Sequence, residues 1–200
     1  MPTCSGISKI ALKSLVLACA LTVGIVPGFA GDTNETIGAQ AFGTGTELGH
    51  NIGVTLNIYG LSTPEDRQLL VQAFNRGQNE GLVTALRKMK PVGRVRITGT
   101  VGFDCSFIEM TPTPTGRKIL FATNREILFG EAFMNTQSKS YNLTAGVLEI
   151  NDQDKRKSTG RLYPAAQLIV NKEGQLQLEL LRNPWNLVSI IDWKGKPGLD

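Results

Sequence analysis

The chain has few of the side chains that metal centres and nucleophilic catalysis require. Its 200 residues contain three cysteines and one histidine, His50. No pair of these residues has the spacing of a zinc site, so the sequence predicts neither a metal nor a cofactor. Cys105, His50 and Asp104 are the candidates for a catalytic set. The competing interpretation of Cys105 is a buried core thiol, since it alternates in phase with Phe103 and Phe107.

Aromatic residues are also scarce, at 6% of the chain. Single-stranded nucleic acid is bound by surfaces that combine basic and aromatic side chains, so we expect no nucleic-acid partner. Basic residues are present, and a sheet could place several of them on one face, where they would meet an acidic glycan or a phosphate group. These candidate ligand-binding residues are Arg94, Arg96, Arg117 and Arg125, with Lys118 beside them. The competing interpretation is an ordinary solvated strand face.

Long apolar runs are absent apart from one near the N-terminus, Ser14 to Val26. Two lysines precede this run and small residues follow it, which predicts a secretory signal peptide over residues 1–30, cleaved after Ala30. A membrane-spanning helix needs about 20 apolar residues, so a retained anchor is the less favoured alternative. Lipidation at Cys19 is another. We therefore expect a secreted or periplasmic protein with no stable membrane insertion after cleavage.

Cleavage would leave 170 residues with one cysteine, Cys105, because Cys4 and Cys19 lie in the signal peptide. No disulfide can then form within the chain, so a hydrophobic core must stabilise the fold. The net charge would fall from +4 to +2, which weakens the electrostatic case for an anionic membrane surface as a partner.

The first part of the mature chain is polar. Residues 31–49 are rich in glycine and threonine, which indicates a flexible leader. A single β-rich domain is then expected over residues 50–200. Its first element is a strand over residues 52–59, where apolar and polar residues alternate.

A helical pair is predicted within residues 63–90. Thr63 followed by Pro64 and two acidic residues is typical of a helix start. This helix is expected to end at Gly77, and a second one to cover residues 80–89.

From residue 94 to residue 192 the apolar residues recur with a period of two, which is the strongest fold signal in the sequence. Further strands are predicted over residues 118–123, 126–129, 143–150, 162–170, 175–181 and 187–191. Short strands joined by glycine, asparagine or proline turns predict an antiparallel sheet, either closed as a barrel or folded as a sandwich. An outer-membrane barrel is less favoured, because no aromatic girdle is present.

Several segments resemble a group of uncharacterised secreted bacterial proteins. The similar segments are Thr113–Ile119, Ala122–Ile127, Gly146–Ile150 and Gly160–Ala166, within residues 94–192. The resemblance implies export and transfers no catalytic residue. Asn124 stands where that group would have an acidic residue.

Two functions follow from these observations. The favoured one is an exported, non-catalytic binding or structural module, because apolar and polar residues alternate regularly in the predicted strands and few side chains are suited to catalysis. Its partner is expected to be a small molecule, a glycan or a protein. The alternative is a secreted hydrolase that uses Cys105 or carboxylates. The carboxylates near predicted strands are Glu109, Glu126, Glu131 and Glu149.

Overall fold

The structure of the protein is a computed structural model that describes residues 34–42, 52–125, 143–173, 175–179 and 184–194. The predicted signal peptide, His50 and the strand expected over residues 126–129 lie outside the described residues.

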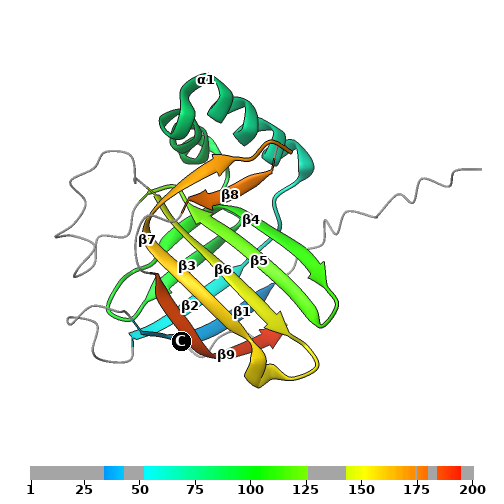
Figure 1. Cartoon of the computed structure of the whole chain (residues 1–200). Coiled ribbons are helices and arrows are strands. Elements are labelled where there is room, and N and C mark those ends of the chain that lie inside the picture. The colour runs from blue at the N-terminus through cyan, green and yellow to red at the C-terminus, as the bar shows by residue number, and fades with distance from the viewer. Residues whose placement is uncertain (1–33, 43–51, 126–142, 174, 180–183, 195–200) are drawn as a thin grey trace, which may run out of the picture.

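Eight antiparallel strands close into a barrel (Figure 1). Their order around the wall is β6-β5-β4-β3-β2-β1-β9-β7, and β7 pairs again with β6. A further strand, β8, pairs with the second half of β7. The strands are β1 Glu35–Phe42, β2 Ile52–Ile58, β3 Gly93–Ile97, β4 Phe103–Thr113, β5 Gly116–Thr123, β6 Leu143–Asn151, β7 Thr159–Val170, β8 Leu176–Glu179 and β9 Trp185–Lys194. The predicted β-dominated antiparallel fold is confirmed, and the barrel is the architecture that forms.

Apolar side chains fill the barrel. They come from alternate positions of each strand, as the period of two requires. Fully buried members of this interior cluster include Leu56, Val95, Ile119, Phe121 and Leu162. A barrel of eight strands is only wide enough to hold its own side chains or one small ligand, and here the side chains occupy the interior.

The prediction of a flexible leader over residues 31–49 is wrong for Glu35–Phe42, which form strand β1. Ile37, Ala39 and Ala41 are buried in the barrel, and the strand pairs with β2 on one side and β9 on the other. Two of the three inward residues are alanine, so the alternation was too faint to indicate a strand.

A β-bulge in β4 changes which side its residues face. Cys105 is opposite Thr123 of β5, whereas Phe107 is opposite Ala122, so two steps along β4 match one step along β5. Cys105 belongs to the interior cluster and Phe107 to a second cluster outside the barrel. The prediction that these two residues face the same way is therefore wrong, because a bulge inserts one residue and shifts the phase.

Helix α1 spans Pro64–Lys88 and begins with a capping box. The backbone N–H of Asp66 donates to the Thr63 hydroxyl at 3.2 Å, and the Asp66 carboxylate accepts from the Thr63 N–H at 2.9 Å. These bonds satisfy donors that a helix start otherwise leaves free. The predicted start is confirmed.

The predicted helical pair is confirmed only in part, because the structure has one helical element with a kink. Gly77 and Gln78 leave the helical conformation, and Gln78 has a φ of 49°. The kink brings the two arms together, since a Cβ on Gly81 would lie 2.4 Å from the carbonyl oxygen of Ala73. The element is therefore two packed arms joined without a loop.

Helix α1 lies against the outside of the barrel, beside β7 and β8 (Figure 1). Leu82, Val83 and Leu86 of its second arm belong to one buried cluster with outward residues of the wall. Those wall residues include Phe107, Ala122, Ala145, Leu168 and Leu176. The helix thus covers one part of the wall and leaves the rest open.

Candidate functional site

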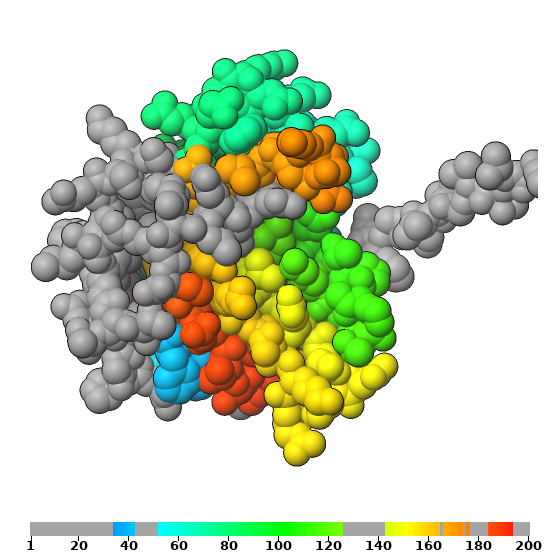
Figure 2. Space-filling view, in the orientation of Figure 1, coloured from blue at the N-terminus to red at the C-terminus, as the bar shows by residue number. Residues whose placement is uncertain are grey.

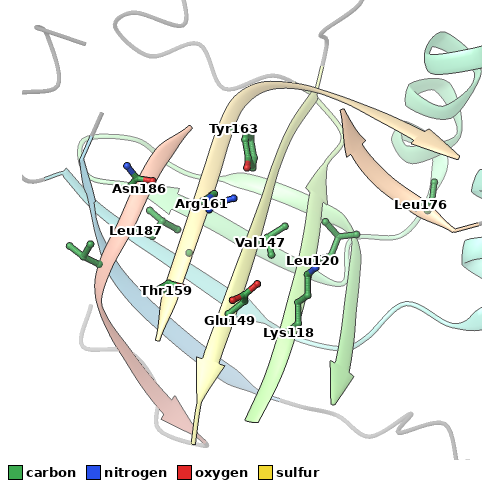
Figure 3. A pocket seen from close by; sticks show the side chains of 12 residues that line it. Lys118, Leu120, Val147, Glu149, Thr159, Arg161, Tyr163, Leu176, Asn186 and Leu187 are labelled. Atoms are coloured by element: carbon green, nitrogen blue, oxygen red, sulfur yellow. The ribbon is translucent and has the colours of Figure 1, made fainter. Parts of the chain in front are cut away.

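A groove of about 560 Å³ lies on the outer wall of the barrel, where β5, β6, β7 and β9 are exposed below β8 (Figure 3). In the space-filling view, β8 separates helix α1 from this part of the wall (Figure 2). The groove is lined by Lys118, Leu120, Val147, Glu149, Thr159, Gly160, Arg161, Tyr163, Leu176, Asn186, Leu187 and Val188.

The alternation of the strands explains why these side chains meet outside the barrel. Ile119, Phe121 and Leu148 fill the interior, so their neighbours Leu120 and Val147 face the groove. The strand register then places them side by side, because residues opposite each other on adjacent strands have close Cβ atoms.

One cross-strand row runs through the middle of the groove. Leu120 is opposite Val147, Val147 is opposite Arg161, and Arg161 is opposite Asn186. The row therefore changes from apolar at β5 to cationic at β7 and to an amide at β9.

A second row carries charge of both signs. Lys118 is opposite Glu149, which is opposite Thr159 of β7. The opposite charges of Lys118 and Glu149 offset each other across the strands.

The end of the groove nearest β8 is apolar. Tyr163 and Leu176 are each 7% exposed and belong to the cluster beneath helix α1. Leu120 is half-buried against the same cluster. The groove therefore ends on a packed apolar surface.

The candidates for a catalytic set do not converge in the described part of the chain. Cys105 is fully buried in the barrel interior, and this burial raises the pKa of its thiol well above the ordinary value. Asp104 faces the other side of the strand, where it accepts from Arg94 at 3.2 Å. His50 lies outside the described residues.

The two candidate carboxylates for hydrolysis that the structure describes, Glu109 and Glu149, lie at separate places. Glu109 forms an ion pair with Arg67 at the start of helix α1. Glu149 lines the groove. Glu126 and Glu131 lie outside the described residues.

The predicted basic face does not form as one surface. Arg94 and Arg96 face outward on β3, and Arg94 also donates to the carbonyl of Val101 at 2.9 Å. Arg125 lies over the ring of Phe103, 5.2 Å from its centroid. Arg117 is the exception, because it points into the barrel in phase with buried Ile119.

Arg117 is the centre of an ion cluster at one end of the barrel. Its side chain is 11% exposed and pairs with Glu35 of β1, with Asp192 of β9 at 2.6 Å and with Asp152 at 3.6 Å. Glu35 and Asp192 are themselves 7% and 10% exposed. Arg117 therefore lies inside the barrel and not on the outer face predicted for it, and it links three segments of the chain.

Sequence reasoning did not single out Arg161, Tyr163 or Asn186. Arg161 and Tyr163 alternate with buried Leu162, which was a signal that they share the outer face. Nothing in the sequence showed that β9 pairs with β7, which brings Asn186 beside Arg161.

Two further observations concern the described residues alone. They contain no group of three histidine, cysteine, aspartate or glutamate side chains that could hold a metal ion. They also contain no helix that is both long and apolar enough to cross a membrane.

No family model, curated protein or solved structure matches the chain. The resemblance to uncharacterised secreted bacterial proteins stays a prediction.

Proposed function

We propose that the protein is an exported, non-catalytic binding module that holds a small molecule in the groove on its outer wall. The groove carries this proposal: its volume of about 560 Å³ lies within the range of about 300–1,000 Å³ that is typical of small-molecule sites. The barrel interior is occupied by its own side chains, so the outer wall is where a ligand fits.

The chemistry of the lining supports the same proposal. Ligand sites combine an apolar surface with a few polar groups that orient the ligand. Leu120, Val147 and Tyr163 supply the apolar surface, and Arg161 and Asn186 supply the polar groups. All five side chains stand on paired strands, which hold them more firmly than loops do.

No observation on the described residues favours the hydrolase alternative. Cys105 and Asp104 face opposite sides of β4, and Glu109 is paired with Arg67. Catalysis by a thiol also needs the thiolate, which burial of Cys105 disfavours.

A fluorescence titration with the neutral apolar probe N-phenyl-1-naphthylamine tests the groove. The exported protein is expected to bind the probe with saturation, and Val147→Trp is expected to abolish binding by blocking the middle of the groove with a bulky side chain. Thr84→Trp is the matched control, because it replaces another β-branched residue at an exposed position of helix α1. Equal binding by the wild type and Val147→Trp would contradict the proposal.

Export is tested separately by the intact mass of the protein purified from its source. The expected mass is that of a chain that begins at Gly31. A chain that retains residues 1–30 would contradict export.

A further inference from the structure

The groove has one cation whose charge is not offset by a directly opposite residue. Arg161 is opposite Val147 on one side and Asn186 on the other, and neither carries a charge. Its side chain is exposed, and among the described residues it makes no ion pair or hydrogen bond.

The other charges of the groove leave Arg161 available. Lys118 and Glu149 are directly opposite each other on β5 and β6. Glu149 is diagonal to Arg161 across β6 and β7, and it forms an ion pair with neither Arg161 nor Lys118. With two cations and one anion on the lining, the groove has an excess of one positive charge.

A planar anion fits the position of Arg161. The guanidinium group binds a carboxylate through two parallel N–H···O bonds. Asn186, the next residue of the row, adds an amide donor on the same outer face. A carboxylate held here would be in contact with both side chains.

The apolar surface begins directly beside this position. Val147 and Leu120 continue the row from Arg161 toward β5, and Tyr163 lies two residues along β7, about 7 Å away. From β9 to β5 the row crosses three strand spacings, or about 14 Å. Figure 3 shows Leu120, Val147, Arg161 and Tyr163 on the same wall.

We infer that the ligand is an amphiphilic carboxylate, with its head on Arg161 and Asn186 and its apolar chain along Val147 and Leu120 toward Leu176. This inference rests on the proposed function, because it names the ligand class of the same groove. The excess positive charge of the groove favours an anionic head group. The apolar end of the groove, at the buried residues Tyr163 and Leu176, favours an apolar chain.

The test displaces N-phenyl-1-naphthylamine with decanoate and with decan-1-ol, which have chains of equal length and differ in the head group. Wild-type protein is expected to prefer decanoate by about tenfold or more, since a hydrogen bond to a charged group has about that effect. Arg161→Gln is expected to bring the two within about twofold. Arg96→Gln, which removes an exposed cation from β3, is expected to leave the preference intact.

The outcomes separate this inference from the proposed function. If the probe binds and Val147→Trp blocks it, but decanoate and decan-1-ol displace it equally, the carboxylate inference is overturned and the groove remains a binding site. Loss of the preference in Arg96→Gln and not in Arg161→Gln would also overturn it. If the probe does not bind at all, the proposed function fails, and this inference fails with it.

Discussion

Arg117 and Asp192 are 75 residues apart in the sequence, yet Nη2 of Arg117 donates to Oδ2 of Asp192 at 2.6 Å inside the barrel. The same nitrogen also pairs with Glu35, so one guanidinium joins the first described strand, β1, to the last, β9, through β5. β1 and β9 are paired neighbours, whereas β5 pairs with β4 and β6 on another part of the wall, so Arg117 joins strands across the barrel interior. The ion cluster is therefore part of what holds the barrel shut.

The cluster predicts a large loss of stability in Arg117→Met. The substitution leaves the carboxylates of Glu35 and Asp192 buried without their cation, and breaking a buried pair in this way costs about 3–5 kcal/mol. Urea denaturation measures the free energy of unfolding. Arg156→Met is the control, because that side chain is 92% exposed and its substitution should change stability by less than about 0.5 kcal/mol. Equal stability of the two variants would show that the cluster does not support the barrel.

Gly38 is predicted to be essential to the packing of β1 against β9. A Cβ at this position would lie 2.5 Å from Cζ3 and 2.7 Å from Cη2 of Trp193. Gly38→Ala is therefore expected to destabilise the protein by about 1–3 kcal/mol, the usual cost of overpacking. The penalty should largely disappear in a Trp193→Ala background, because the two residues are in contact.

Thermal denaturation of the single and double variants measures this coupling. Gly60→Ala is the matched control, since nothing lies within 4 Å of a Cβ at Gly60. If Gly38→Ala lowers stability equally in the wild-type and Trp193→Ala backgrounds, contact with Trp193 is not the cause of the loss.

Because helix α1 is kinked, replacing glutamine with glycine is expected to have opposite effects on stability at positions 78 and 72. Gln78 has φ 49° and ψ −143°, a conformation that strains residues with a Cβ. Gln78→Gly should relieve this strain and stabilise the protein by about 1 kcal/mol. Gln72→Gly, at an exposed site within the first helical arm, should destabilise it by about the same amount. Chemical denaturation distinguishes them, and a loss of stability in both variants would refute strain at the kink.

Cys105 predicts a pH dependence of stability. Its pKa is raised by burial, so the folded protein keeps the thiol proton while the unfolded chain loses it above about pH 8.5. The contribution of Cys105 to the free energy of unfolding is therefore fully present below about pH 8.5. Above that pH it falls by about 1.4 kcal/mol for each pH unit. The measurement compares unfolding free energies of the wild type and Cys105→Ala at pH 7.5 and pH 10.

The variant should lose less stability than the wild type over that interval. A thiol reagent gives a second readout, since Cys105 should react only as fast as the protein unfolds. Rapid labelling of the folded protein would contradict the buried position of the thiol.

The sequence predicted the elements of the fold better than their arrangement. The start of α1 at Thr63 and Pro64 and the alternating strands were visible because capping residues and periodicity act locally. Strand β1 was missed because alanine at positions 39 and 41 gives little hydrophobic contrast. The bulge beside Cys105 was missed because one inserted residue leaves no mark in the composition.

The candidate site was less predictable, because it depends on which strands are neighbours. Arg117 was placed with Arg94 on one face, although its phase with Ile119 and Phe121 indicated the interior. That indication was obscured because Leu120 between them is also apolar. The pairing of β7 with β9 brings Asn186 to Arg161, and it is set by closure of the whole barrel rather than by either segment.

The most direct test of binding in the groove is a titration of the ¹⁵N-labelled protein with decanoate, followed through the backbone amide signals. Saturable shifts are expected at Val147, Arg161 and Tyr163, with Arg96 on β3 unaffected. The Val147→Trp variant should show none of these shifts. An absence of shifts in the wild type, or shifts centred on β2 and β3, would contradict the assignment of the groove as the binding site.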